Sequence, residues 1–209
     1  MSKILYIQAS PRGERSKSIA VADAFILTYQ EKNPSDKVEV LNVFEENLVD
    51  FGAIAAKAKY TIIHGQSHTE EELAVWKNVE KTIERFKSAD KYVIAVAMWN
   101  FSIPWRLKQY IDILVQPGYT FGVNEDGSYK GLVTGKKVFI SYARGGDYSS
   151  EQARSLDLQS KYLEQILGFM GLVDIQSIKV EPTLACGPDA AEEKVASAIE
   201  KAKQMAEEF

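Results

Sequence analysis

Five short apolar segments alternate along the chain with longer segments of helical pattern, and this alternation limits the folds that the sequence can adopt. The apolar segments span residues 3–7, 37–41, 92–97, 136–141 and 173–180. Helical patterns occupy 16–31, a broken stretch from 50 to 88, 104–115, 150–168 and 189–209. Parallel strands need right-handed crossovers, which helices supply. The pattern therefore predicts an α/β fold in which helices cover both faces of a parallel sheet, with a two-layer arrangement as the less favoured alternative.

The composition of the five strands predicts their places in the sheet. The first, third and fourth segments are nearly continuous in apolar residues, as expected of strands covered on both faces. The second and fifth alternate apolar with polar residues, which suits edge strands. A small hairpin is also expected within residues 120–132, because Asp126-Gly127 lies there between potential strand residues.

Length and charge limit the classes of protein to which the chain can belong. Its 209 residues fit one domain, 1–209, with no internal repeat or linker. The net charge of −4 comes without a basic stripe, which argues against a nucleic-acid partner. No apolar run approaches the ~20 residues of a membrane span. The only cysteine, Cys186, excludes an internal disulfide, so we expect a cytoplasmic protein without a membrane partner.

The loop between the first strand and the first helix is rich in hydroxyl and cationic side chains. Ser10, Ser16 and Ser18 can donate hydrogen bonds, Lys17 adds charge, and the following helix presents free N–H groups. This combination is typical of a phosphate site, although Ser16 alone also fits an ordinary helix N-cap. The loop has neither G-x-G-x-x-G nor G-x-x-x-x-G-K-[ST], which argues against a dinucleotide site and a P-loop. A mononucleotide remains.

The loop after the third strand contains Met98, Trp99, Asn100 and Phe101. Aromatic faces beside an amide suit a flat heteroaromatic ring with a polar edge. Either aromatic residue taken alone fits an ordinary core position equally well. Their grouping around Asn100 at a strand end favours a ligand.

The loop after the fourth strand contains Arg144, Gly145 and Gly146. The two glycines let backbone N–H groups approach a ligand closely, and the arginine can offer charge. A plain turn is the alternative interpretation. Ligands of open parallel sheets bind outside the carboxyl ends of the strands, so we expect this loop to share one site with the other two.

A ring with a polar edge and one phosphate describes FMN, and the three loops together resemble those of the FMN-dependent NADH:quinone oxidoreductases, also called azoreductases. The similarity covers nearly the whole chain, including residues 4–7, 91–92 and 107–112. It implies a flavodoxin-like, doubly wound sheet of order 2-1-3-4-5. It further implies a homodimer with noncovalent FMN, one per subunit, near the interface. NADH or NADPH would supply electrons for the two-electron reduction of quinones and azo compounds.

The resemblance also assigns roles to particular residues. It implies that the flavin phosphate is bound by Ser10, Ser16, Lys17 and Ser18, and that the ring is bound by residues 98–101 and 144–146. Arg144, through its backbone and side chain, is our candidate for stabilising the negative charge that reduction places on the ring. No obligate acid or base is identifiable.

Three aromatic residues are candidates for the walls of the acceptor site, because planar acceptors must be held largely by stacking. They are Phe101, Tyr119 and Phe121. The resemblance implies that the hairpin carrying Phe121 reaches across the dimer interface. We expect no metal site, because His64 and His68 have no carboxylate partner at a fixed spacing.

The predicted reaction is a ping-pong transfer, in which the nicotinamide cofactor delivers hydride to flavin N5 and leaves before the acceptor enters. A flavodoxin-type electron carrier is the main alternative. Such carriers are usually smaller and more acidic, and they lack additions such as residues 50–88 and the 120–132 hairpin. A flavin-binding module without turnover is a third possibility.

Overall fold

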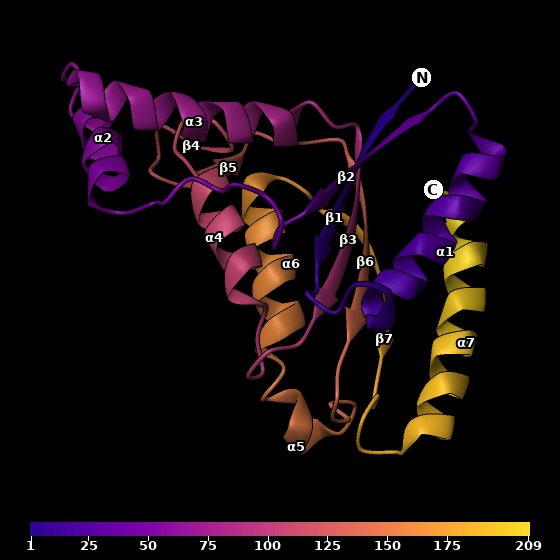
Figure 1. Ribbon diagram of the computed structural model, residues 1–209. Helices are drawn as coiled ribbons and strands as arrows, with labels where there is room; N and C mark the ends of the chain where they lie inside the picture. The colour runs from indigo at the N-terminus through magenta and orange to yellow at the C-terminus, as the bar shows by residue number, and fades with distance from the viewer.

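The computed structural model describes residues 1–209 and is built on a five-stranded parallel sheet (Figure 1). Its strands are β1 (Lys3–Ala9), β2 (Lys37–Asn42), β3 (Lys91–Ala97), β6 (Lys137–Ala143) and β7 (Asp174–Val180). They lie in the order β2-β1-β3-β6-β7, and every neighbouring pair is parallel. The predicted fold and strand order are thus confirmed, with the two alternating segments at the edges.

Helices cover both faces of this sheet (Figure 1). They are α1 (Lys17–Lys32), α2 (Ala53–Ile63), α3 (Glu70–Lys87), α4 (Trp105–Leu114), α5 (Glu151–Arg154), α6 (Leu158–Met170) and α7 (Pro188–Ala206). Helices α1 and α7 pack side by side on one face, and α3, α4 and α6 contribute to the core on the other. None of the helices combines the length and the apolar character needed to cross a membrane.

Strand β3 shows how the sequence builds a core on each face of the sheet. Tyr92, Ile94 and Val96 belong to the 28-residue cluster beneath α3, α4 and α6, whereas Val93 and Ala95 belong to the 17-residue cluster beneath α1 and α7. Successive side chains of a strand point to opposite faces. A central strand between two helical layers must therefore be apolar at every position, and all five of these residues are buried.

The long stretch between β2 and β3 forms a helical arm, made of α2 and α3, that extends beyond the sheet (Figure 1). Helix α3 begins with a capping box, in which the Thr69 hydroxyl accepts from the Glu72 N–H and the Glu72 carboxylate accepts from the Thr69 N–H. Its last turns return to the core, where Phe86 meets Tyr110 of α4 edge to face. The arm is anchored at that end.

The expected hairpin is present as β4 (Phe121–Val123) and β5 (Tyr129–Gly131). Gly127 has a φ of 83° in the connecting turn, a conformation that favours glycine. The hairpin lies beside the end of α6, at the opposite end of the sheet from the strand arrowheads (Figure 1). It therefore projects from the amino-terminal edge of the sheet.

Candidate functional site

The turn between β1 and α1 contains buried hydroxyl groups that lack a full set of partners. Ser10, Ser16 and Ser18 are each at most 3% exposed. The Ser10 Oγ has no hydrogen-bond partner, and the Ser16 Oγ lies 3.2 Å from the Ser18 Oγ. The N–H groups of Lys17 and Ser18, in the first turn of α1, have no acceptor either. A buried polar group without a partner is costly, so this set of donors points to an anionic ligand such as a phosphate.

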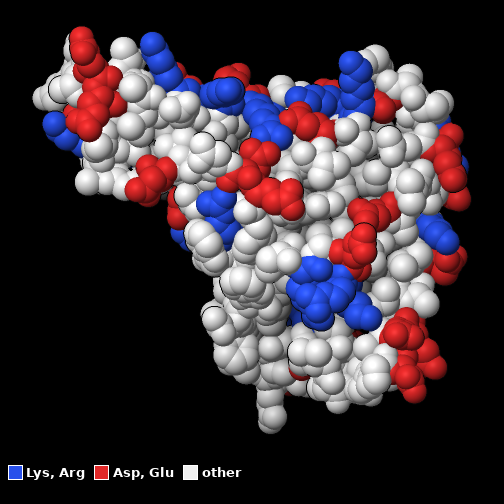
Figure 2. All heavy atoms as spheres, viewed as in Figure 1, with Lys and Arg blue, Asp and Glu red and all other residues white.

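The same turn is surrounded by positive charge. Arg12 and Arg15 are exposed, and Lys17 is half-buried. Figure 2 shows cationic side chains gathered on the molecular face where α1 begins. The Ser16 Oγ also accepts from the Ile19 N–H at 3.4 Å, so Ser16 is the helix N-cap as well as a candidate ligand. The two interpretations of Ser16 are therefore compatible.

The loop after β3 closes a tight turn whose two central residues are left-handed. Trp99 and Ser102 exchange backbone hydrogen bonds of 2.9 Å. Between them, Asn100 has a φ of 47° and Phe101 a φ of 67°. A left-handed conformation costs a residue with a Cβ atom roughly 1–2 kcal/mol. Backbone strain of this kind is concentrated at ligand sites, and here it presents Asn100 and Phe101 on the surface.

The loop after β6 offers backbone amides and keeps its arginine side chain inside the protein. Arg144 is 1% exposed. Its Nε donates to Gln159 at 2.9 Å, its Nη1 to Glu181 at 3.2 Å, and its Nη2 to both carboxylate oxygens of Asp157 at 3.0 and 2.9 Å. The N–H groups of Gly145 and Gly146 have no acceptor. The donors that this loop leaves free are therefore on the backbone.

The carboxylate of Asp157 is charged in this environment. Burial alone would raise its pKa, but hydrogen bonds from Ser160 and the nearby charges of Arg144 and Lys179 outweigh burial and hold the pKa below its usual value. Neither Asp157 nor Gln159 was singled out in the sequence. The only available signal was Asp157 as a possible N-cap before an apolar pattern, which gives no indication of its pairing with Arg144.

Two of the three predicted acceptor-binding aromatic residues lie far from the loops after β1, β3 and β6. Tyr119 donates to Glu80 at 2.6 Å, and the Phe121 ring packs tilted against that of Phe169 with 4.7 Å between centroids, both near the amino-terminal edge of the sheet. Phe101 lies at the carboxyl edge with Tyr148, 6.4 Å between ring centroids. A single chain therefore does not bring the three aromatic residues together.

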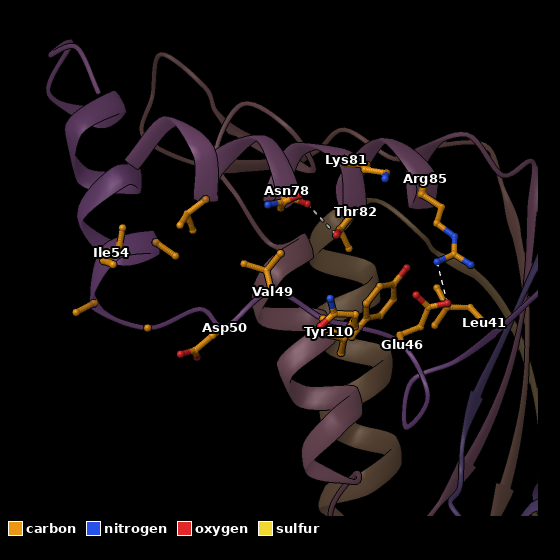
Figure 3. A pocket seen from close by; sticks show the side chains of 16 residues that line it. Leu41, Glu46, Val49, Asp50, Ile54, Asn78, Lys81, Thr82, Arg85 and Tyr110 are labelled. Atoms are coloured by element: carbon orange, nitrogen blue, oxygen red, sulfur yellow. Dashed lines mark hydrogen bonds and ion pairs between the residues drawn. The ribbon is translucent and has the colours of Figure 1, made fainter. Parts of the chain in front are cut away.

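Three cavities accompany these elements. One of about 510 Å³ borders the β1–α1 turn at Gly13 and Glu14. Another of about 650 Å³ lies at Trp105 and Tyr162, between α4 and α6. The largest, about 840 Å³, lies under the arm, where Figure 3 shows Tyr110 below α3. None of the three is lined by residues 98–101 or 144–146, the loops after β3 and β6 that are called the ring loops below. Trp99 and Phe101 of these loops are exposed in one chain.

The two histidines lie on the arm and contact backbone carbonyls. The His64 Nδ1 lies 2.7 Å from the Tyr60 carbonyl oxygen, and the His68 Nε2 lies 2.8 Å from that of Ala58. The Cys186 Sγ similarly donates to the Pro182 carbonyl oxygen at 3.1 Å.

Comparisons with known proteins agree with this fold. The family model described as "Flavodoxin-like fold" matches residues 2–206. An FMN-dependent NADH:quinone oxidoreductase of Nitratidesulfovibrio vulgaris strain DP4 is 56% identical over 210 residues, covering 100% of both chains. A crystal structure of an azoreductase from Bacillus anthracis strain Sterne has a TM-score of 0.91 at 32% identity, again over 100% of both chains.

A further solved structure connects the fold with a cofactor. It is an FMN-dependent NADH-azoreductase from Bacillus anthracis strain Ames Ancestor in complex with FMN. Its TM-score is 0.86 at 28% identity, covering 99% of this chain and 100% of that one. The resemblance inferred from the three loops is thus confirmed. The chain belongs to the family of FMN-dependent NADH:quinone oxidoreductases, whose members have a flavodoxin-like fold.

Proposed function

We propose that this protein is an FMN-dependent oxidoreductase that passes two electrons from NADH or NADPH to quinones and azo compounds. The observation that carries the proposal is the unpartnered, buried Ser10 hydroxyl beside the free N–H groups of α1, at the same sheet edge as the two ring loops. The names of the relatives support it, because they are names of FMN-dependent reductases. A flavodoxin-type carrier is not favoured.

In this proposal the β1–α1 turn holds the flavin phosphate. The hydroxyls of Ser10, Ser16 and Ser18 and the N–H groups of Lys17 and Ser18 donate to the phosphate oxygens. Hydrogen bonds to a charged acceptor contribute about 1.5–3 kcal/mol each. FAD is expected to bind poorly, because these donors surround a terminal phosphate and leave no place for an adenylate group.

The two other loops would hold the flavin ring. Met98, Trp99, Asn100 and Phe101 would contact the ring, with the Asn100 amide available to its polar edge. The free N–H groups of Gly145 and Gly146 donate to the edge that gains negative charge. Bound FMN supplies hydride acceptance at N5. Arg144 acts there through the loop that it holds, because its guanidinium donors are already paired.

The working unit is a homodimer in which each chain, 1–209, is a single FMN-binding domain. Trp99 and Phe101 are exposed on the ring loops of one chain, and Tyr119 and Phe121 lie at its other end. A second copy placed against the arm and α4 would bring its own Tyr119 and Phe121 to those loops. Large apolar side chains on these elements are exposed and support such a contact, among them Ile54, Tyr60, Ile63 and Trp105.

One open face of the ring then serves donor and acceptor in turn, which makes the reaction ping-pong. Initial-rate plots at several quinone concentrations should give parallel lines, whereas intersecting lines would require a ternary complex and a second pocket. The lone, unpaired Cys186 suits a reducing compartment, and we place the protein in the cytoplasm.

The proposal is tested by cofactor titration and turnover. The apoprotein should bind FMN tightly, bind FAD poorly, and oxidise NADH steadily when a quinone is added. Ser16→Ala and Ser18→Ala should each weaken FMN binding roughly tenfold or more. Asn100→Ala should disturb contacts to the flavin ring and therefore weaken the binding of riboflavin as well as that of FMN. A protein that takes up no FMN would overturn the proposal. Uptake of FMN without quinone turnover would instead favour the alternative function, a flavodoxin-type electron carrier.

A further inference from the structure

The first turn of α6 is attached to both ring loops at once. We propose that Asp157 and Gln159 are positioning residues, which set the separation of the loop after β3 and the loop after β6 and so the fit of the flavin ring between them. The inference rests on the proposed function, because it assumes that these loops hold a ring. Both side chains are buried, Asp157 at 3% and Gln159 at 0% exposure.

The attachment to the β3 loop uses a side chain and the backbone. The Gln159 Nε2 donates to the Val96 carbonyl oxygen at 3.3 Å, immediately before the loop begins. The Leu158 N–H donates to the carbonyl oxygen of Phe101 at 3.0 Å, inside the left-handed turn. The strained turn is therefore held from its base and from one of its two central residues.

The attachment to the β6 loop runs through Arg144. The Gln159 Oε1 accepts from the Arg144 Nε at 2.9 Å, so one amide group joins the ends of two neighbouring strands. Asp157 accepts from the Arg144 Nη2 with both oxygens. It also accepts from the Ser160 N–H at 2.9 Å as the N-cap of α6. The carboxylate thus fixes the arginine and the start of the helix together.

The network extends to the loop after β7 and balances the buried charge. Glu181 accepts from the Arg144 Nη1 at 3.2 Å and from the Tyr148 N–H at 3.3 Å. The Lys179 Nζ lies 3.7 Å from Asp157. Two carboxylates therefore face two cations, and the arginine has no donor atom left without an acceptor group. A buried charge that loses its partner is strongly destabilised, so the position of this loop depends on Asp157.

An ordinary structural ion pair would stabilise the fold without a specific effect on binding of the flavin ring. The test therefore compares binding of the ring alone with binding of the ring and phosphate together. Gln159→Met keeps the volume and removes both side-chain hydrogen bonds. Asp157→Asn keeps a good N-cap and removes the charge that pairs with Arg144. We would titrate each apoprotein with riboflavin, which has the ring without the phosphate, and with FMN.

Both variants are expected to weaken the binding of riboflavin and of FMN by the same factor, about tenfold, because only the ring loops move. Ser18→Ala should instead weaken the binding of FMN and leave the binding of riboflavin unchanged. In Asp157→Asn, the midpoint potential of bound FMN should shift to more positive values, since less negative charge then opposes the electrons that the ring accepts. Thr69→Ala removes the capping box of α3 on the arm and serves as a control for lost stability, with riboflavin affinity unchanged.

Unchanged riboflavin affinity and an unchanged absorption spectrum of bound flavin in Gln159→Met would overturn the inference, as would an equal loss in Thr69→Ala. These outcomes are distinct from failure of the proposed function. If that function is wrong, the unmodified protein itself will not bind FMN. If only the positioning role is wrong, the unmodified protein binds FMN and the α6 variants bind it equally well.

Discussion

At the scale of single residues, the left-handed pair at the end of β3 places the greatest demand on the backbone. Asn100 and Phe101 both have positive φ, and neither is glycine. Asparagine tolerates this conformation better than most residues do, whereas phenylalanine does not. The turn is nevertheless retained by the backbone bonds between Trp99 and Ser102 and by the Leu158 N–H. The fold therefore stabilises a conformation that the local sequence disfavours.

This strain predicts an unusual order of stability at position 101. Phe101→Gly should unfold with a free energy about 1 kcal/mol higher than that of Phe101→Ala, because only glycine is free of the left-handed penalty. Both variants lack the ring, so the comparison isolates the backbone. Urea denaturation of the two apoproteins measures the difference. Equal stability, or a more stable alanine variant, would show that the turn is not strained.

At the scale of elements, the hairpin is fixed to α6 by a contact that only glycine permits. A Cβ atom on Gly131 would lie 2.2 Å from the Gly171 nitrogen, a backbone atom that has no room to move. Gly171 itself has a φ of 106° and ends α6 as a left-handed C-cap. The backbones of β5 and α6 are thus in direct contact, and the hairpin is held at a fixed place relative to the sheet.

Gly131→Ala should consequently displace the hairpin and lower the free energy of unfolding by about 1–3 kcal/mol. Gly122→Ala, on the other strand of the hairpin, is the matched control. Its Cβ atom would approach only side-chain atoms, those of the flexible Lys130 at 3.2 Å and of Leu132 at 3.8 Å, so we expect a change within about 0.5 kcal/mol. Thermal or urea unfolding of both variants decides the matter, and similar losses would contradict the packing argument.

The start of α6 should make stability depend on pH through Asp157. Its pKa is lowered in the folded state, because hydrogen bonds from Ser160 and the charge of Arg144 outweigh burial. Stability from a depressed carboxyl pKa is present above the unfolded value, about 4, and is lost as the pH falls through the folded value. Asp157→Asn should therefore be less stable than the unmodified chain near neutral pH, with the difference shrinking below about pH 4. A difference that is constant with pH, followed by urea titration, would exclude the ionised carboxylate as its source.

The sequence predicted most elements well because their patterns are local. Strand boundaries agree to within a few residues, and the alternating segments are the edges. The helix expected at 150–168 is instead divided into α5 and α6, since Asp157 turns toward Arg144 and caps a new helix. That division depends on a pairing between residues distant in sequence, which no local pattern contains.

At the scale of the whole molecule, the direction of the chain determines which predicted residues can meet. The three flavin loops follow the carboxyl ends of parallel strands, so their convergence was predictable from topology. A crossover helix carries the chain back to the amino ends. Tyr119 and Phe121 come after α4, and the same rule places them at the other edge. Nothing in one sequence indicates how a second copy would be oriented to reunite them.

The proposed dimer predicts that activity depends on protein concentration. Dilution into monomers should abolish quinone turnover, because each ring would lose the aromatic wall supplied by Tyr119 and Phe121 of the partner subunit. Phe121→Ala should change the relative kcat/KM for large and small acceptors while leaving FMN content unchanged. Sedimentation under assay conditions establishes the oligomeric state. A fully active monomer would remove the partner from the site.

The ring loops and the aromatic hairpin lie at opposite ends of each chain, and this placement predicts how defective alleles of the gene would interact. In the proposed dimer, a chain whose ring loops are disabled and a chain whose hairpin is disabled would each be inactive with copies of itself. In a mixed dimer of the proposed kind, the intact ring loops of one chain would meet the intact hairpin of the other, and one active centre would be restored. Two defective alleles expressed together would then complement each other, although neither encodes a working enzyme.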